Sequence, residues 1–252
     1  MFRYLLLTLS FLTVQSQAAE KCTFLSSHKV IRESGSLLYY SWQELDRLVF
    51  ESNVLPDTGE IAHFQDWVRS KVDPDQMTLL ARQRKLYFEH FGSEAVYSFD
   101  LLLNKKAGDI QPISCLEALL LTEQAKLHPL EKTQTEFQAF VLLNKSVNPP
   151  QLKVYFASGT DLFAPSVLPF LPLIHSDVQN GWRVSFHVHN HPFTFDNPAG
   201  DIAGTTIPSG DRNSGDVKVF IDLRAQVGLL EARITNGFNT VHVKSGEFEL
   251  FH

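Results

Sequence analysis

The sequence predicts an α/β (α+β) fold in which a mixed β-sheet is flanked by helices. Helical patterns dominate between residues 41 and 128, short apolar strand patterns dominate after residue 136, and one further helical pattern separates the last strands. The chain has 252 residues and a hydrophobic content of 44%, which is enough for a normal core in one or two domains. Its formal net charge of -6 provides no basic surface for nucleic acid, so we expect no nucleic-acid partner.

The N-terminus has the pattern of a secretory signal peptide. Arg3 precedes an apolar run over residues 4–14, and Ala18 and Ala19 offer small side chains around a cleavage point. We expect residues 1–19 to be removed and the mature protein to be secreted or periplasmic. The apolar run is too short to span a bilayer comfortably, so no stable membrane anchor is expected after cleavage.

Cys22 and Cys115 are the only cysteines of the chain. In an oxidising compartment we expect them to form a disulfide, which would tie the mature N-terminus to the middle of the chain. Two free buried thiols are the alternative.

Residues 20–112 are expected to form a mainly helical N-terminal region. Ser41, with Glu44 three residues later, matches a capping box and predicts a helix that begins there. Apolar spacing predicts further helices over residues 61–70 and 75–91. Apolar stripes of this kind usually form core, so we assign them no chemistry.

Residues 113–252 are expected to form a second domain that is richer in strands. A helix is predicted from Ser114 to the His128-Pro129 pair, because the residue before a proline is disfavoured in a helix. Two prolines predict an irregular segment over residues 167–175. The predicted strands are residues 136–144, 152–157, 182–189, 232–235, 240–243 and 248–251, and a helix is predicted from Asp216 to about Glu231.

Three histidines alternate along the strand predicted over 182–189 and into the residues that follow it. His187, His189 and His191 stand at every second position, and strand side chains at this spacing project from one face. The opposite, apolar face is predicted to carry Trp182, Val184, Phe186 and Val188. Two imidazoles and one carboxylate suit zinc and can leave a fourth position for water. The sequence therefore predicts a metal site on the polar face of this strand.

Carboxylates on both sides of the histidines can complete such a site. Glu136 opens the first strand of the second domain and is the candidate general base, which takes a proton from water and passes it to a leaving amine. Asp211 and Asp216 follow the histidines, and either can supply the third ligand. The histidines at positions 175, 242 and 252 are expected to be ordinary surface residues.

These residues resemble the JAMM (MPN+) family of zinc metalloproteases, and within it the RadC-like branch. The resemblance covers residues 114–252 and rests on Glu136 before an apolar strand, on His189-Asn190-His191-Pro192, on Pro208-Ser209, and on Asp216-Val217 at a helix start. It implies a JAMM/MPN-like (cytidine-deaminase-like) core. It also implies that Zn²⁺ is bound by His189, His191 and an aspartate, that Glu136 is the general base, and that a serine supports the tetrahedral intermediate.

The spacing of the serine and the aspartate departs from the family pattern. Family members place Ser-x-x-Asp soon after the histidine pair, whereas here the loop is longer, and Ser209-Gly210-Asp211 and Ser214-Gly215-Asp216 each lack one residue. We prefer Asp216 as the third ligand because it opens a helix as the family's aspartate does. Ser214 or Ser209 then takes the serine's role, and Asp211 is the alternative ligand.

The sequence therefore predicts an exported zinc metallopeptidase that hydrolyses a peptide or isopeptide bond in a peptide or protein substrate. The irregular spacing leaves a second hypothesis, a catalytically silent MPN-like module for protein interaction. The sequence contains no indication of oligomeric state.

Overall fold

The computed structural model of the chain describes residues 29–34, 37–43, 47–52, 59–148, 150–195 and 204–251. The predicted signal peptide over 1–19, Cys22 and His252 lie outside these residues. The strands are β1 (Lys29–Ser34), β2 (Leu37–Gln43), β3 (Asp109–Pro112), β4 (Phe137–Asn144), β5 (Gln151–Ser158), β6 (Arg183–Asn190), β7 (Glu231–Thr235) and β8 (Asn239–Lys244). The α-helices are α1 (Gly59–Arg69), α2 (Gln76–Phe91), α3 (Tyr97–Leu103), α4 (Cys115–Leu127), α5 (Leu171–Gln179) and α6 (Gly215–Val227). Short 3-10 helices are η1 (Arg47–Phe50), η2 (Glu94–Val96) and η3 (Phe248–Leu250).

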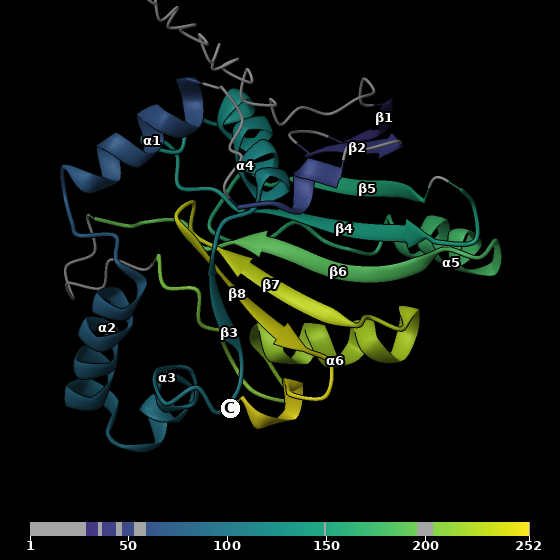
Figure 1. Cartoon of the computed structure of the whole chain (residues 1–252). Helices are drawn as coiled ribbons and strands as arrows, with labels where there is room; N and C mark the ends of the chain where they lie inside the picture. The colour runs from purple at the N-terminus through teal and green to yellow at the C-terminus, as the bar shows by residue number, and fades with distance from the viewer. Residues whose placement is uncertain are drawn as a thin grey trace, which may run out of the picture.

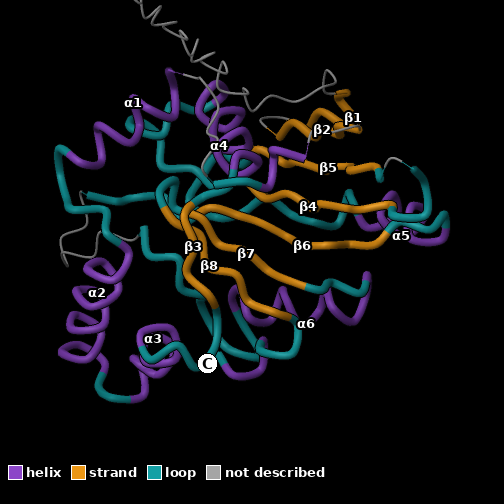
Figure 2. The backbone as a smooth tube through the Cα atoms, in the orientation of Figure 1, coloured by secondary structure: helices purple, strands orange, loops and turns teal. Residues whose placement is uncertain are grey.

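The eight strands of the described residues form one mixed sheet with the order β1-β2-β5-β4-β6-β7-β8-β3 (Figure 1). Neighbouring strands are antiparallel except for β6 and β7, which are parallel. The predicted α+β class with a mixed sheet is confirmed. The N-terminal region was predicted to be mainly helical, yet it supplies β1 and β2 at one edge of the sheet and β3 at the other (Figure 2).

Helices cover both faces of this sheet. In Figure 1, α1 and α4 lie above the strands and α6 lies below them. Phe137 and Phe156 belong to the buried cluster under α4, whereas Phe140 and Phe220 belong to the cluster against α6. The central strands β4 and β6 are therefore packed on both sides, which holds their side chains in defined places.

The strict alternation predicted for β6 is wrong because this strand contains a bulge. Phe186 and Val188 pack in the cluster under α4, as expected. Trp182 and Val184 instead pack in the cluster on the α6 side, the side that the histidines face. The pairing of β6 with β4 shifts its register between Val184 and Phe186, and one extra residue in a strand reverses the side to which its earlier residues point.

Three other local predictions are also wrong. Ser41 lies within β2, which pairs with β5, because a long-range strand pairing outweighs a local capping pattern. The segment 167–175 contains the start of α5, with Pro172 in its first turn, where a backbone N–H would have no partner in the helix. Residues 248–251 contain η3 and no strand, and their spacing of three places Phe248 and Phe251 together in the cluster against α6.

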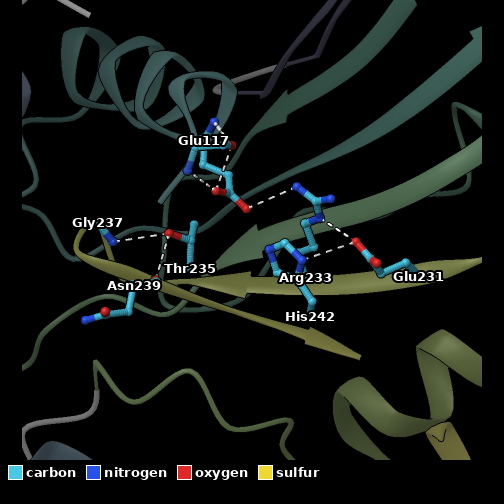
Figure 3. A network of polar contacts seen from close by, with 8 residues as sticks. Glu117, Glu231, Arg233, Thr235, Gly237, Asn239 and His242 are labelled. Carbon is cyan, nitrogen blue, oxygen red and sulfur yellow. Dashed lines mark hydrogen bonds and ion pairs between the residues drawn. The ribbon is translucent and has the colours of Figure 1, made fainter. Parts of the chain in front are cut away.

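A polar network connects α4 to the sheet (Figure 3). The fully buried Glu117 accepts hydrogen bonds from the backbone N–H and hydroxyl of Ser114 in a capping box, so the predicted start of this helix is confirmed. Its second oxygen lies 3.7 Å from Arg233, which also pairs with Glu231 at 2.7 Å. His242 lies 3.6 Å from Glu231 and is only partly exposed, so the prediction of an ordinary surface histidine is wrong for it. Burial and the charge of Arg233 lower the pKa of His242.

Cys115 is fully buried at the start of α4 and is disulfide-bonded. The alternative of a free thiol therefore does not hold for this residue, while its predicted partner, Cys22, lies outside the described residues. Among the helices that the structure describes, none combines the length and the apolar character needed to cross a membrane.

Candidate metal centre

The candidate ligands come from two consecutive elements of the chain. His189 belongs to β6, His191 directly follows it, and Asp216 lies in the first turn of α6. α6 leads into β7, which is parallel to β6, so the helix begins beside the carboxyl end of β6. In open α/β sheets, bound molecules and ions commonly lie just outside the carboxyl ends of the strands, where such helices begin. The crossover thus brings Asp216 to His191 and His189, which lie 25 and 27 positions before it in the chain.

The distances within this cluster match those of a zinc site. The Nε2 atoms of His189 and His191 are 3.3 Å apart. Nε2 of His189 lies 3.3 Å from Oδ1 of Asp216, and Nε2 of His191 lies 3.3 Å from Oδ2 of the same carboxylate. Ligands that stand about 2.0–2.1 Å from zinc in a tetrahedral arrangement are about 3.3 Å from one another. Among the described residues, these three form a group whose ligand atoms all lie within 4.8 Å. The geometry therefore fits three zinc ligands and leaves the fourth position free.

The hydrogen bonds of His191 select the tautomer that a metal needs. Its Nδ1 lies 2.8 Å from the carbonyl oxygen of Thr205, so Nδ1–H donates there and the Nε2 lone pair points into the cluster. Burial lowers the pKa of His191, but Asp216 and Glu136 outweigh this effect and its pKa is about 9. A bound cation would take the place of that proton.

Asp216 remains ionised in this surrounding. Burial acts to raise its pKa, but the charges and hydrogen bonds of His189 and His191 hold the pKa of Asp216 well below its ordinary value. The backbone N–H of Ser209 also donates to its carboxylate, at 2.8 Å. A carboxylate that stays charged at the positive end of a helix is suited to bind a cation together with neutral imidazoles.

Glu136 reaches the same edge of the sheet from the neighbouring strand. β4 is antiparallel to β6, and Gln138 pairs with His189, so Glu136 lies beyond the start of β4 at the level of His191. Burial raises the pKa of its carboxyl group, while His191 and His189 lower it and Asp216 raises it. The net pKa is raised, which is the direction that a general base working near neutral pH requires.

Asn190 holds the backbone around Glu136 and was not predicted to have a role. Its Oδ1 accepts a hydrogen bond of 2.7 Å from the N–H of Phe137, and its Nδ2 donates to the carbonyl of Thr135 at 3.0 Å. Its side chain is 2% exposed. Asn190 stands between His189 and His191, and its side chain points away from theirs because strand side chains alternate. Its hydrogen bonds therefore hold the backbone on both sides of Glu136 against β6. In the sequence, the position of Asn190 within His-Asn-His-Pro was the one feature that could have indicated this role.

Gly159 also controls the position of Glu136. A Cβ atom at this position would lie 2.1 Å from the carbonyl oxygen of Glu136, which itself accepts a hydrogen bond from the Gly159 N–H. We expect Gly159→Ala to lower the free energy of unfolding by about 1–3 kcal/mol through overpacking. Displacement of Glu136, the candidate general base, should also lower the rate of any reaction at this site by about 100-fold.

Gly246→Ala is the matched control, because no atom lies within 4 Å of the added Cβ at that turn. Thermal unfolding and activity measured on both variants check the expectation. Equal stability and activity in the two proteins would show that the close contact at Gly159 affects neither folding nor the position of Glu136.

The structure distinguishes the two candidate serines and the two candidate aspartates. Asp211 accepts hydrogen bonds from the N–H of Asn213 at 2.7 Å and from the Ser214 hydroxyl at 3.2 Å, so both residues take part in a turn, and the group formed by His189, His191 and Asp216 does not include Asp211. The Ser209 hydroxyl accepts from the N–H of Asp216 at 3.3 Å. Ser209 therefore lies beside the carboxylate of Asp216, whereas the Ser214 hydroxyl donates to Asp211.

His187 is buried beside the cluster but is not one of the three ligands. Its Nε2 lies 2.9 Å from Oε1 of Gln138, and its ring packs against Phe220. Burial lowers its pKa to about 3, so it is neutral. With His189, Asp216 and Val219 it lines a hollow of about 240 Å³ on one side of the ligands.

Comparisons of the chain with protein-family models, with curated proteins and with solved structures give no match. The case for a function therefore rests on the geometry of the site.

Proposed function

We propose that this protein is an exported zinc-dependent peptidase that hydrolyses a peptide or isopeptide bond. The observation that supports the proposal most strongly is the convergence of His189, His191 and Asp216 beside the partly buried Glu136: the two Nε2 atoms lie 3.3 Å apart, and each lies 3.3 Å from a different carboxylate oxygen of Asp216. The same residues carry the resemblance to the JAMM family. The JAMM/MPN-like core and the export of the chain belong to this proposal.

Each residue has a separate task in the proposed reaction. His189, His191 and Asp216 would hold Zn²⁺ and leave one open position. Zinc at such a site supplies a Lewis acid that polarises the substrate carbonyl and lowers the pKa of water to about 7. Glu136 takes the proton of the attacking water and passes it to the leaving amine, which makes the amine a better leaving group.

Ser209 is the better candidate for contact with the substrate oxygen. It borders the ligands, and its hydroxyl proton is free to turn toward substrate because Oγ only accepts from the N–H of Asp216. A hydrogen bond to the developing oxyanion stabilises the transition state more than the ground state. The hydroxyl proton of Ser214 is instead donated to Asp211, which makes Ser214 the weaker candidate.

The second hypothesis, a catalytically silent interaction module, was motivated by the irregular serine and aspartate spacing. That motivation is weak, because Asp216 stands at the histidines despite the spacing. The measured metal content decides between the two hypotheses.

The full mature protein is expected to contain close to one zinc ion per chain and to cleave unfolded protein substrates such as casein. A strong chelator should abolish cleavage, and added Zn²⁺ should restore it. Removal of zinc should also lower the melting temperature, because a ligand that binds only the folded state stabilises it. Protein without stoichiometric zinc, or cleavage that survives complete removal of the metal, would contradict the proposal.

A further inference from the structure

A second hollow, of about 440 Å³, borders the ligand cluster at His191. His191 and Ser209 both line it, so it opens directly onto the proposed site of reaction. Its remaining walls come from residues 204–210 and from α2, η2 and α3. Figure 1 shows α2 and α3 at the left, on the side toward which the arrow of β6 points. The N-terminal helices therefore build part of a cavity beside the metal ligands.

These helices are fastened to the segment that orients His191. Gln76, at the start of α2, is 2% exposed, and its Nε2 donates to the hydroxyl of Thr206 at 2.8 Å. Asn236, in the turn between β7 and β8, donates both to Oε1 of Gln76 at 3.0 Å and to the carbonyl of Gly204 at 2.6 Å. Buried polar groups that satisfy one another in this way fix relative positions. The cavity is thus a formed part of the fold, with walls held against the histidine that borders it.

The lining of this cavity is mainly apolar and aromatic. Tyr87 packs edge-on against Phe91 with ring centroids 5.6 Å apart, and its ring also lies 5.4 Å from that of Phe99. Ile207 and Pro208 form the facing wall. A volume of 440 Å³ lies in the range of about 300–1,000 Å³ typical of small-ligand pockets, and such walls favour apolar groups.

Phe91 is a large aromatic side chain that is 70% exposed although it stands beside this cavity. Water around an exposed ring is released when an apolar group covers it, which stabilises the complex. Exposed Glu94 adds a negative charge to the lining. The cavity therefore disfavours acidic groups and favours a large apolar group.

We propose that this cavity is a specificity pocket that binds a large apolar, preferably aromatic, side chain of the peptide substrate next to the bond that is cleaved. The assignment rests on the proposed peptidase function. The two hollows border different members of the ligand set: His191 and Ser209 line one, and His189 and Asp216 line the other. A peptide that crosses the cluster can place its neighbouring residues in both. The N-terminal helices thus select the substrate.

The first test measures cleavage of internally quenched peptides that carry Phe, Leu, Ala or Asp on either side of the scissile bond. The zinc-loaded full protein should cleave the Phe peptide at least about tenfold faster than the Ala peptide in kcat/KM, as expected for a large side chain in an apolar pocket. Phe91→Ala should remove most of this preference by raising KM for the Phe peptide more than KM for the Ala peptide.

Phe88→Ala is the matched control, because Phe88 stands on the same helix, is 51% exposed and does not line the cavity. It should behave like the wild type with every peptide. A preference for small or acidic residues would refute the assignment of this cavity as an aromatic specificity pocket. An aromatic preference that Phe91→Ala does not reduce would refute it as well.

A second test needs no catalysis. N-acetyl-phenylalaninamide should show NMR line broadening with the protein and N-acetyl-alaninamide should not, and Ala95→Trp, which fills the cavity, should abolish the broadening. If the aromatic probe binds in this way but no peptide is cleaved, the pocket stands and the peptidase proposal fails. If peptides are cleaved but the probe binds equally to wild type and Ala95→Trp, the peptidase stands and the pocket is refuted.

Discussion

Glu136→Gln is expected to lower kcat for zinc-dependent peptide cleavage by about 10²- to 10⁴-fold and to leave the bound zinc near one per chain. Glutamine has nearly the same shape but cannot take up a proton from the attacking water. Asn190 and Gly159 hold the backbone around residue 136, and the carboxylate accepts one backbone hydrogen bond, from Ala164, which the amide oxygen of glutamine can also accept. The loss should therefore appear in kcat, with a smaller change in KM.

Steady-state kinetics together with metal analysis of the same preparation checks this expectation. Glu89→Gln is a suitable control, since Glu89 is an exposed residue of α2 whose partner at 3.8 Å is Lys85. Cleavage by Glu136→Gln at the wild-type rate would show that another group is the base. Loss of zinc in this variant would mean that residue 136 acts as a ligand.

Asp216→Ala is expected to abolish stoichiometric zinc binding and all cleavage. The substitution removes one of three protein ligands, so the loss in affinity should exceed the 10- to 100-fold typical of residues that only support ligands. It also leaves His189 and His191 without their anionic partner. The melting temperature of this variant should consequently no longer respond to Zn²⁺ or to a chelator.

Asp211→Ala provides the direct contrast, because it removes the other aspartate that the sequence allowed as third ligand. Its carboxylate binds Asn213 and Ser214 within a turn, so this variant should keep its zinc and most of its activity. Isothermal titration calorimetry with Zn²⁺ measures the zinc affinity of each variant and so distinguishes the two. Retention of tight zinc binding by Asp216→Ala, or its loss in Asp211→Ala, would reverse the assignment.

Local patterns in the sequence predicted much of the C-terminal half correctly. Helix α4 begins at its capping box, β4, β5, β6, β7 and β8 lie where apolar runs indicated strands, and α6 begins at the expected turn. Such features depend on residues a few positions apart, which is why they can be predicted without a fold. The pairing of His189 with His191 belongs to the same class, since a separation of two residues places both on one side of an extended chain.

Other features depended on partners far away in the chain. Ser41 matched a helix cap but joined a strand because β5 offered its backbone a partner. The bulge in β6 moved Trp182 and Val184 to the α6 side, and no property of β6 alone indicated it. The choice between Asp211 and Asp216 likewise depended on where the crossover from β6 to α6 ended.

By itself, the sequence determined the chemistry that this protein can offer: two imidazoles at alternate positions, a glutamate before a buried strand, and an acidic residue at a helix start. Only the tertiary structure decided which groups meet. The antiparallel pairing of β4 with β6 brings Glu136 to the histidines, the crossover brings Asp216, and the packing of α2 and α3 adds an apolar cavity. The physical reason is that side-chain direction follows from local backbone geometry, whereas convergence of distant residues depends on the register and packing of the whole sheet.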